Sequence, residues 1–158
     1  MEPLVVLISI FILTAVGTKI TRGKWLFSFA GKTALSVMML FTAIGHFLYP
    51  EGMALMVPDF IQNKTELIYF TGFIEIAAAA GLLIPRFQIQ TAWLLILFFI
   101  LILPANIYAA LNHVNIKMAA FDGPGPLYLW FRIPLQFLFI AWAYYFGIKK
   151  ANFNKWKF

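Results

Sequence analysis

The sequence predicts an all-α fold, a bundle of helices that spans a membrane. Of its 158 residues, 63% are hydrophobic and only 11% are charged, a composition too apolar to surround a soluble core with polar surface. Five apolar stretches are each long enough to cross about 30 Å of hydrocarbon. A chain of this length forms one membrane domain, residues 1–158, with no space for a separate soluble module.

The five predicted helices follow the apolar stretches in order. They cover about residues 3–20, 31–49, 66–84, 88–111 and 127–148. Basic residues follow the first stretch instead of preceding it, which is typical of a retained anchor and not of a signal peptide. Residues 50–64 are too short to span and too apolar for an ordinary loop. We expect them to lie in the membrane interface and to cover the bundle.

Lysine and arginine are concentrated in alternate connections between the helices. The basic residues on this side are Lys19, Arg22, Lys24, Arg86, Lys149, Lys150, Lys155 and Lys157. By the positive-inside rule, the N-terminus then lies outside and the C-terminus in the cytoplasm. This topology and contact with anionic lipids account for the net charge of +6, so nucleic acid is not an expected partner.

Two charged residues fall inside the apolar stretches, Glu75 in the third predicted helix and Arg132 in the fifth. An unpaired charge at bilayer depth is costly, so such residues invite a functional explanation. At 1.5 Å per residue, Arg132 lies about 7 Å and Glu75 about 15 Å from the outer ends of their helices. Either the long arginine side chain bridges this difference in depth, or the polar head of a ligand lies between the two.

Further polar residues share the outer half of the predicted bundle. His46 and Tyr49 lie near the end of the second helix, Asn106 in the fourth and Gln136 in the fifth. Because four helices contribute polar groups at similar depth, we expect an outward-facing polar pocket. Its candidate ligand-binding residues are His46, Tyr49, Glu75, Asn106, Arg132 and Gln136.

Each candidate also has a purely structural explanation. Arg132 is near enough to its helix end to extend to the interface, Glu75 could be a protonated glutamate hydrogen-bonded between helices, and Asn106 could join two helices. A haem held by two histidines would need His113 to fold inward from its loop toward His46, so haem is disfavoured. The chain has no cysteine, which excludes thiolate and iron–sulfur chemistry, and no metal site is expected.

Five groups of motifs follow one another between residues 30 and 148. They are Gly45-His46-Phe47, Met56-Val57-Pro58-Asp59, Thr71-Gly72-Phe73-Ile74-Glu75 with Gly81-Leu82-Leu83-Ile84-Pro85, Pro104-Ala105-Asn106-Ile107-Tyr108, and Leu129-Trp130-Phe131-Arg132-Ile133-Pro134-Leu135-Gln136. With these motifs in this order, the sequence resembles the DoxX family of small membrane proteins. The resemblance implies a four-helix core, to which the first helix is an addition. We expect the protein in a bacterial cytoplasmic membrane.

The resemblance also implies an association with respiratory quinol oxidation, because some members of that family accompany a terminal oxidase or a thiosulfate:quinone oxidoreductase. Together with the polar pocket, it predicts a protein that binds a quinone or another lipid-like molecule, as an accessory subunit of a membrane oxidoreductase. No redox centre is visible in the sequence, so an autonomous enzyme is not expected. The family is also distantly similar to four-helix quinone reductases that depend on cysteine, whose thiol chemistry this chain cannot perform.

Two other classes of function remain open. A non-catalytic assembly protein would use its buried polar residues to fix helix packing, and besides lipids it would contact another membrane protein or a second copy of itself. A small transporter is the third class, which the absence of an inverted repeat disfavours.

Overall fold

The protein is an integral membrane protein of the all-α class. The computed structural model describes residues 2–151, and five of its helical segments are long and apolar enough to cross a membrane. This confirms the fold class that the composition predicts. The elements are α1 Glu2–Arg22, α2 Phe27–Leu48, α3 Pro50–Ala54, α4 Lys64–Leu83, α5 Gln88–Leu111, η1 Pro126–Tyr128, α6 Leu129–Trp142 and η2 Ala143–Lys149.

The second helix begins four residues earlier than expected, at Phe27 instead of residue 31. The Ala30 amide already donates to the Leu26 carbonyl at 2.9 Å, and Ala30 is buried. The preceding turn is tight because the Thr18 hydroxyl accepts a hydrogen bond from the Leu26 amide at 3.3 Å. Lys32, which the sequence places at the start of the helix, therefore lies inside it.

The last membrane segment consists of three kinds of helix. A short 3₁₀ turn, η1, starts at Pro126 and leads into α6, which continues through Pro134. From Ala143 the winding changes to a π-helix for seven residues, unusually long for a conformation that mostly appears as a single turn. Gly147 allows this wide helix to approach α5, since a Cβ there would come within 2.5 Å of Ala92 Cβ.

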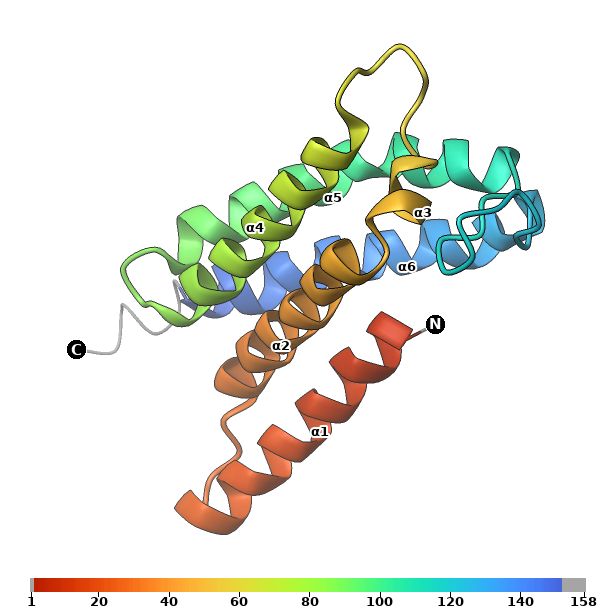
Figure 1. The fold of residues 1–158 in the computed structure, drawn as a ribbon. Helices are drawn as coiled ribbons and strands as arrows, with labels where there is room; N and C mark the ends of the chain where they lie inside the picture. The colour runs from red at the N-terminus through yellow and green to blue at the C-terminus, as the bar shows by residue number, and fades with distance from the viewer. Residues whose placement is uncertain (1, 152–158) are drawn as a thin grey trace.

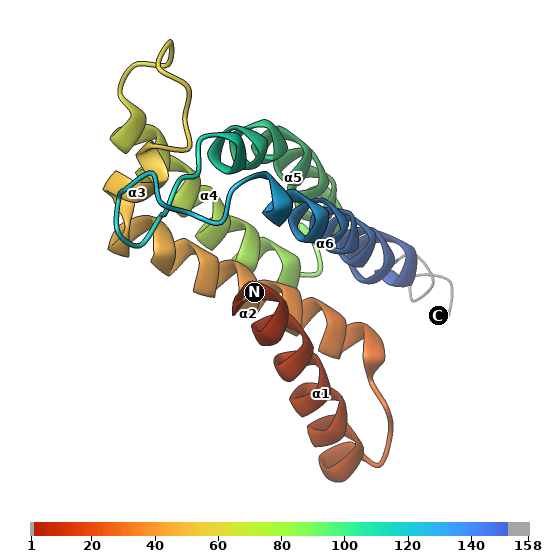
Figure 2. The same cartoon turned by 90° about the vertical axis from the view of Figure 1, so that its right-hand side faces the viewer.

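α2 is central to the packing, with α1 on one side and α4 on the other, while α5 contacts α4, α6 and η2. Figures 1 and 2 show α1 at the edge of the molecule, beside α2. Its Phe11 ring packs on Trp142 of α6 and on Phe146 of η2, with ring centres 5.1 Å and 5.7 Å apart. Large apolar side chains from α1, α2, α4, α5 and α6 form one buried cluster. Its members include Leu7, Leu35, Met38, Met39, Leu82, Leu95, Phe99 and Phe139.

The two ends of the bundle differ in structure. At one end, which we call the basic end, the start of α2, the start of α5 and the π-helix η2 come together, and the Trp142 indole donates to the Gly31 carbonyl at 3.0 Å. At the other end, which we call the capped end, the α5–η1 loop (residues 112–125) packs on α3 (Figure 2). There Gly52 lies directly against the Ile116 carbonyl, where a Cβ would overlap it.

An exposed ion pair ties the start of α1 to the capped end. Lys117 Nζ in the α5–η1 loop lies 2.7 Å from Glu2 Oε1. The Glu2 carboxylate raises the pKa of Lys117 above its ordinary value, through the hydrogen bond and the opposite charge. α1 is therefore attached at its first residue as well as along α2.

Candidate functional site

Glu75 lies on the buried face of α4 and is only 5% exposed. Small residues share that face, among them Gly72 and Ala79, and they allow α2 to approach α4 closely. A Cβ on Gly72 would lie 2.9 Å from His46 Cβ. The inward orientation of Glu75 thus follows from the glycine one turn before it, as the sequence pattern predicts.

His46 of α2 faces Glu75 and is held by the backbone of α4. Its Nδ1 lies 2.9 Å from the Ile68 carbonyl oxygen and 3.1 Å from the Thr71 hydroxyl, which itself donates to that carbonyl at 2.8 Å. The other ring nitrogen, Nε2, lies 3.6 Å from Glu75 Oε2. This distance fits an ion pair but is too long for a hydrogen bond.

The contact at Nδ1 determines what Nε2 can do. A carbonyl oxygen only accepts, so we assign the Nδ1 proton to the bond with Ile68, and a neutral ring then leaves Nε2 as an acceptor. Nε2 and an ionised Glu75 would be two acceptors facing each other. The pair therefore needs a proton of its own, on the ring or on the carboxyl, or a donor from a bound molecule.

Arg132 of α6 pairs with Asn106 of α5 instead of Glu75. Its guanidinium donates to Asn106 Oδ1 at 3.0 Å, and among the described residues no salt bridge joins Arg132 to Glu75. The simplest expectation, a direct pair of the two charges, is therefore not realised. The difference in depth explains why, since each charge finds a polar partner at its own level on the neighbouring helix.

The two remaining candidates have different environments. Gln136 is 2% exposed, and its amide donates to the Phe99 carbonyl at 2.6 Å, so it joins α6 to α5. Tyr49 follows α2 directly and is 36% exposed, outside the buried set. The structure thus brings together His46 with Glu75 and Asn106 with Arg132, as two separate pairs.

Two buried atoms of these pairs have no hydrogen-bond partner in residues 2–151. They are Glu75 Oε2 and Asn106 Nδ2. Buried polar groups are nearly always satisfied, so each exception requires an explanation. Glu75 Oε2 is an acceptor when the carboxyl is ionised, whereas Asn106 Nδ2 is a donor. The first atom belongs to the His46–Glu75 pair and the second to the Asn106–Arg132 pair.

A second polar cluster lies at the basic end, and the sequence analysis missed it. Gln88, 5% exposed, accepts a hydrogen bond from Lys32 Nζ at 2.8 Å and donates to the Gly147 carbonyl of the π-helix at 2.8 Å. Lys32 would have been recognised as half-buried within a helix only if α2 had been predicted to start at Phe27. No sequence signal indicates the π-helical carbonyls.

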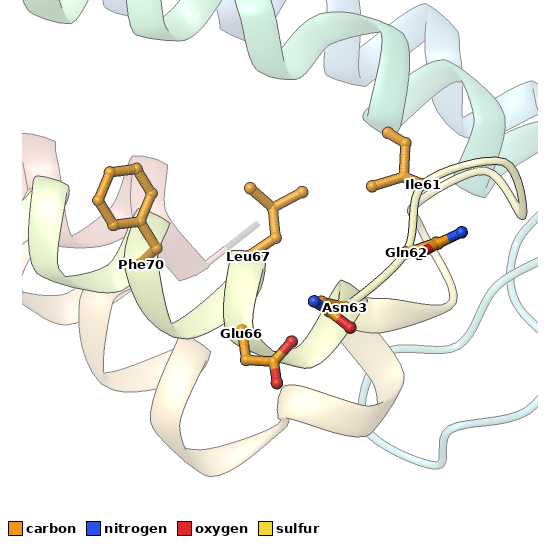
Figure 3. A pocket seen from close by; sticks show the side chains of 6 residues that line it. All are labelled: Ile61, Gln62, Asn63, Glu66, Leu67 and Phe70. Carbon is orange, nitrogen blue, oxygen red and sulfur yellow. The ribbon is translucent and has the colours of Figure 1, made fainter.

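Two hollows lie along α4 on the surface of the described residues. The larger, about 430 Å³, lies at the capped end of α4 and is open to the outside. Figure 3 shows its lining, with the apolar side chains of Ile61, Leu67 and Phe70. The smaller, about 240 Å³, lies between α4 and α5. Neither is lined by Glu75 or Arg132, so the expected pocket bounded by these two residues is not one of them.

The fold and the buried pairs define a polytopic membrane protein with ionisable residues in its interior, a class in which such residues are costly and usually functional. The chain belongs to the family described as a domain of unknown function, DUF8561, whose model matches residues 35–147. This range contains all six candidate residues and leaves α1 outside. Comparisons with curated proteins and with solved structures give no match. Among residues 2–151, no group of three histidine, aspartate or glutamate side chains could hold a metal ion.

Proposed function

We propose that this membrane protein binds a quinone or another lipid-like molecule, with the polar head of the ligand beside Glu75 and His46. One observation carries the proposal: Glu75 Oε2 is buried next to an imidazole nitrogen and has no hydrogen-bond partner within the described chain. A quinol hydroxyl would supply the missing donor. A quinone carbonyl would instead accept from a protonated Glu75 or His46.

The position of the Arg132–Asn106 pair supports an amphiphilic ligand. Arg132 and Asn106 lie nearer the capped end than Glu75, by the difference in depth along their helices. A head group that enters from that side would meet the unpaired Asn106 amide before it reaches Glu75.

The chemistry assigned to this chain is acceptance of a proton, not transfer of electrons. His46 is held by the Ile68 carbonyl with Nε2 directed at Glu75, the arrangement of an oriented base. If a quinol is oxidised at the site, the proton of the hydroxyl beside Glu75 would pass to this pair, the proton of the other hydroxyl to water, and the two electrons to a redox centre of a partner subunit. We therefore infer an accessory role of the DoxX type in a membrane oxidoreductase of the bacterial cytoplasmic membrane, supported by the motifs that contain these residues.

Binding of a short-chain ubiquinone analogue to the purified protein in nanodiscs tests the proposal. We expect Glu75→Gln and Arg132→Ala each to weaken binding about ten-fold or more, the effect of losing a hydrogen bond to a charged group. Glu51→Gln is the matched control, because it changes an exposed carboxylate on α3 in the same way as Glu75→Gln. Equal affinity of all four proteins would contradict the proposal.

A second function, assembly of a larger membrane complex without ligand binding, is favoured by a different observation. Each polar pair joins two neighbouring helices, α2 to α4 and α5 to α6, as expected if polar residues only fix the packing. Purification in mild detergent separates the two functions. A stoichiometric partner protein, with no quinone bound by the wild type, would support assembly and exclude the ligand site.

A further inference from the structure

The smaller hollow is an apolar groove between α4 and α5. Its walls are Ile74, Ala77, Ala78, Thr91, Leu94, Leu95 and Phe98. Ala77 and Leu94 are exposed, so the groove opens away from the core, toward the surrounding lipid. Two small alanines face large leucine and phenylalanine side chains across it, and this difference in size leaves the space between the helices unfilled.

A cation lies in the turn that joins the two walls of this groove. Arg86 is exposed in the α4–α5 turn, with its guanidinium carbon 5.8 Å from the centre of the Phe87 ring. Ile74 lies nine residues before Leu83, the last residue of α4, or about 14 Å along the axis. That is close to half of the hydrocarbon thickness, one leaflet of a bilayer.

The described helix ends and turns of the basic end carry no acidic side chain. The chain has six acidic residues, and they are Glu2, Glu51, Asp59, Glu66, Glu75 and Asp122, none of which belongs to the turns or helix ends of the basic end. Lys32, also at this end, is bonded to the neutral Gln88 side chain. This end of the described chain is therefore complementary in charge to an anionic group.

We propose that the α4–α5 groove binds one acyl chain of an anionic phospholipid and that Arg86 holds the phosphate of the same molecule. Arginine matches a phosphate by two parallel N–H···O hydrogen bonds. The groove runs from near the turn that holds Arg86 to a depth of about one leaflet, which suits a ligand with a charged head and a hydrocarbon tail. A transmembrane helix of a second copy would fill the groove but would leave the charge of Arg86 unbalanced. The proposal does not depend on quinone binding at Glu75.

Native mass spectrometry of the protein, extracted from vesicles of phosphatidylcholine and phosphatidylglycerol in equal amounts, tests both parts of the site. Arg86→Gln removes the head-group contact, and Arg22→Gln is its control, an exposed arginine at the end of α1. Ala77→Leu fills the groove, and Ala80→Leu is its control, an exposed alanine of α4 that does not line the groove. All four positions are at the surface, so the fold is expected to persist, and circular dichroism checks this.

The wild type is expected to retain one phosphatidylglycerol in preference to phosphatidylcholine. Arg86→Gln should lower this preference about five-fold, the contribution of one basic side chain near an anionic lipid, and Ala77→Leu should lower the retention of both lipids. The proposal is overturned if Arg86→Gln behaves as Arg22→Gln, or Ala77→Leu as Ala80→Leu. It is also overturned if the wild type appears as a lipid-free dimer that Ala77→Leu dissociates.

Discussion

Replacing Gly72 by alanine is a sharp test of the packing that orients the site. At Gly72, α4 and α2 pack tightly, and an added Cβ would lie 2.9 Å from His46 Cβ and 3.2 Å from Phe47 Cε2. The first of these atoms is attached directly to the backbone of α2, so a side-chain rotation cannot relieve the contact. The two helices would have to separate by about 0.6 Å to reach an ordinary carbon–carbon distance of about 3.5 Å.

The expected size of the effect follows from two opposing contributions. Overpacking of this kind costs about 1–3 kcal/mol, whereas alanine is better than glycine inside a helix by about 0.5–1 kcal/mol. The net loss of stability is then between about 0 and 2.5 kcal/mol. The separation also lengthens the contacts of His46 with the Ile68 carbonyl and with Glu75, so ligand binding at the proposed site should weaken in the same variant.

Gly17→Ala is the matched control, because Gly17 lies within α1 and a Cβ there meets nothing within 4 Å. This variant keeps only the gain in helix propensity and should be slightly more stable than the wild type. Reversible unfolding in mixed micelles with increasing sodium dodecyl sulfate measures both free energies of unfolding. If Gly72→Ala is as stable as Gly17→Ala, the close approach of α2 and α4 is not what holds His46 against Glu75.

Three further predictions use other parts of the molecule. Glu2→Gln should return the raised pKa of Lys117 toward its ordinary value of 10.5; with Glu2 ionised, the ion pair stabilises the fold fully from neutral pH up to pH 10.5 and ceases to do so as the pH rises through the raised value, and an unchanged NMR titration of Lys117 would contradict this. Gln88→Leu leaves Lys32 and the Gly147 carbonyl of the π-helix without their hydrogen-bond partner. This should lower the free energy of unfolding by about 1–3 kcal/mol in the same micellar assay; wild-type stability would show that water replaces both bonds. In a chain without cysteine, Glu51→Cys should react with a membrane-impermeant maleimide on intact cells and Lys24→Cys should not, and the reverse pattern would invert the proposed topology.

The class of fold could be predicted from the sequence because a stretch of about 20 apolar residues crosses the hydrocarbon of a membrane as a helix. The inward orientation of Glu75 could also be predicted, since Gly72 and Ala79 mark the face of α4 that a neighbouring helix approaches. The proposed orientation in the membrane rests on the basic residues alone, and two of them, Lys155 and Lys157, lie outside the described residues. Orientation therefore stays a prediction.

The partners of the charged residues could not be predicted. A sequence gives the depth of a side chain and the face of its helix, but not which helix stands opposite that face. Glu75 and Arg132 fall at different depths, and the fold gives each a polar neighbour at its own level, His46 in one case and Asn106 in the other. The cluster around Gln88 was missed for a related reason, because it depends on backbone carbonyls that carry no sequence signature.

The π-helix η2 makes the direction of the C-terminal lysines sensitive to chain length. In an α-helix, one residue added or removed turns everything that follows by about 100° and moves it about 1.5 Å along the axis. The wide winding of Ala143–Lys149 leaves Lys149 and Lys150 beside the Tyr145 ring, at 5.7 Å and 5.4 Å from its centre. Loss of a single residue from this stretch would tighten the winding and turn both lysines to another side of the molecule. Insertions and deletions here, more than substitutions, are therefore the changes by which relatives of this chain could redirect a charged terminus without altering the membrane core.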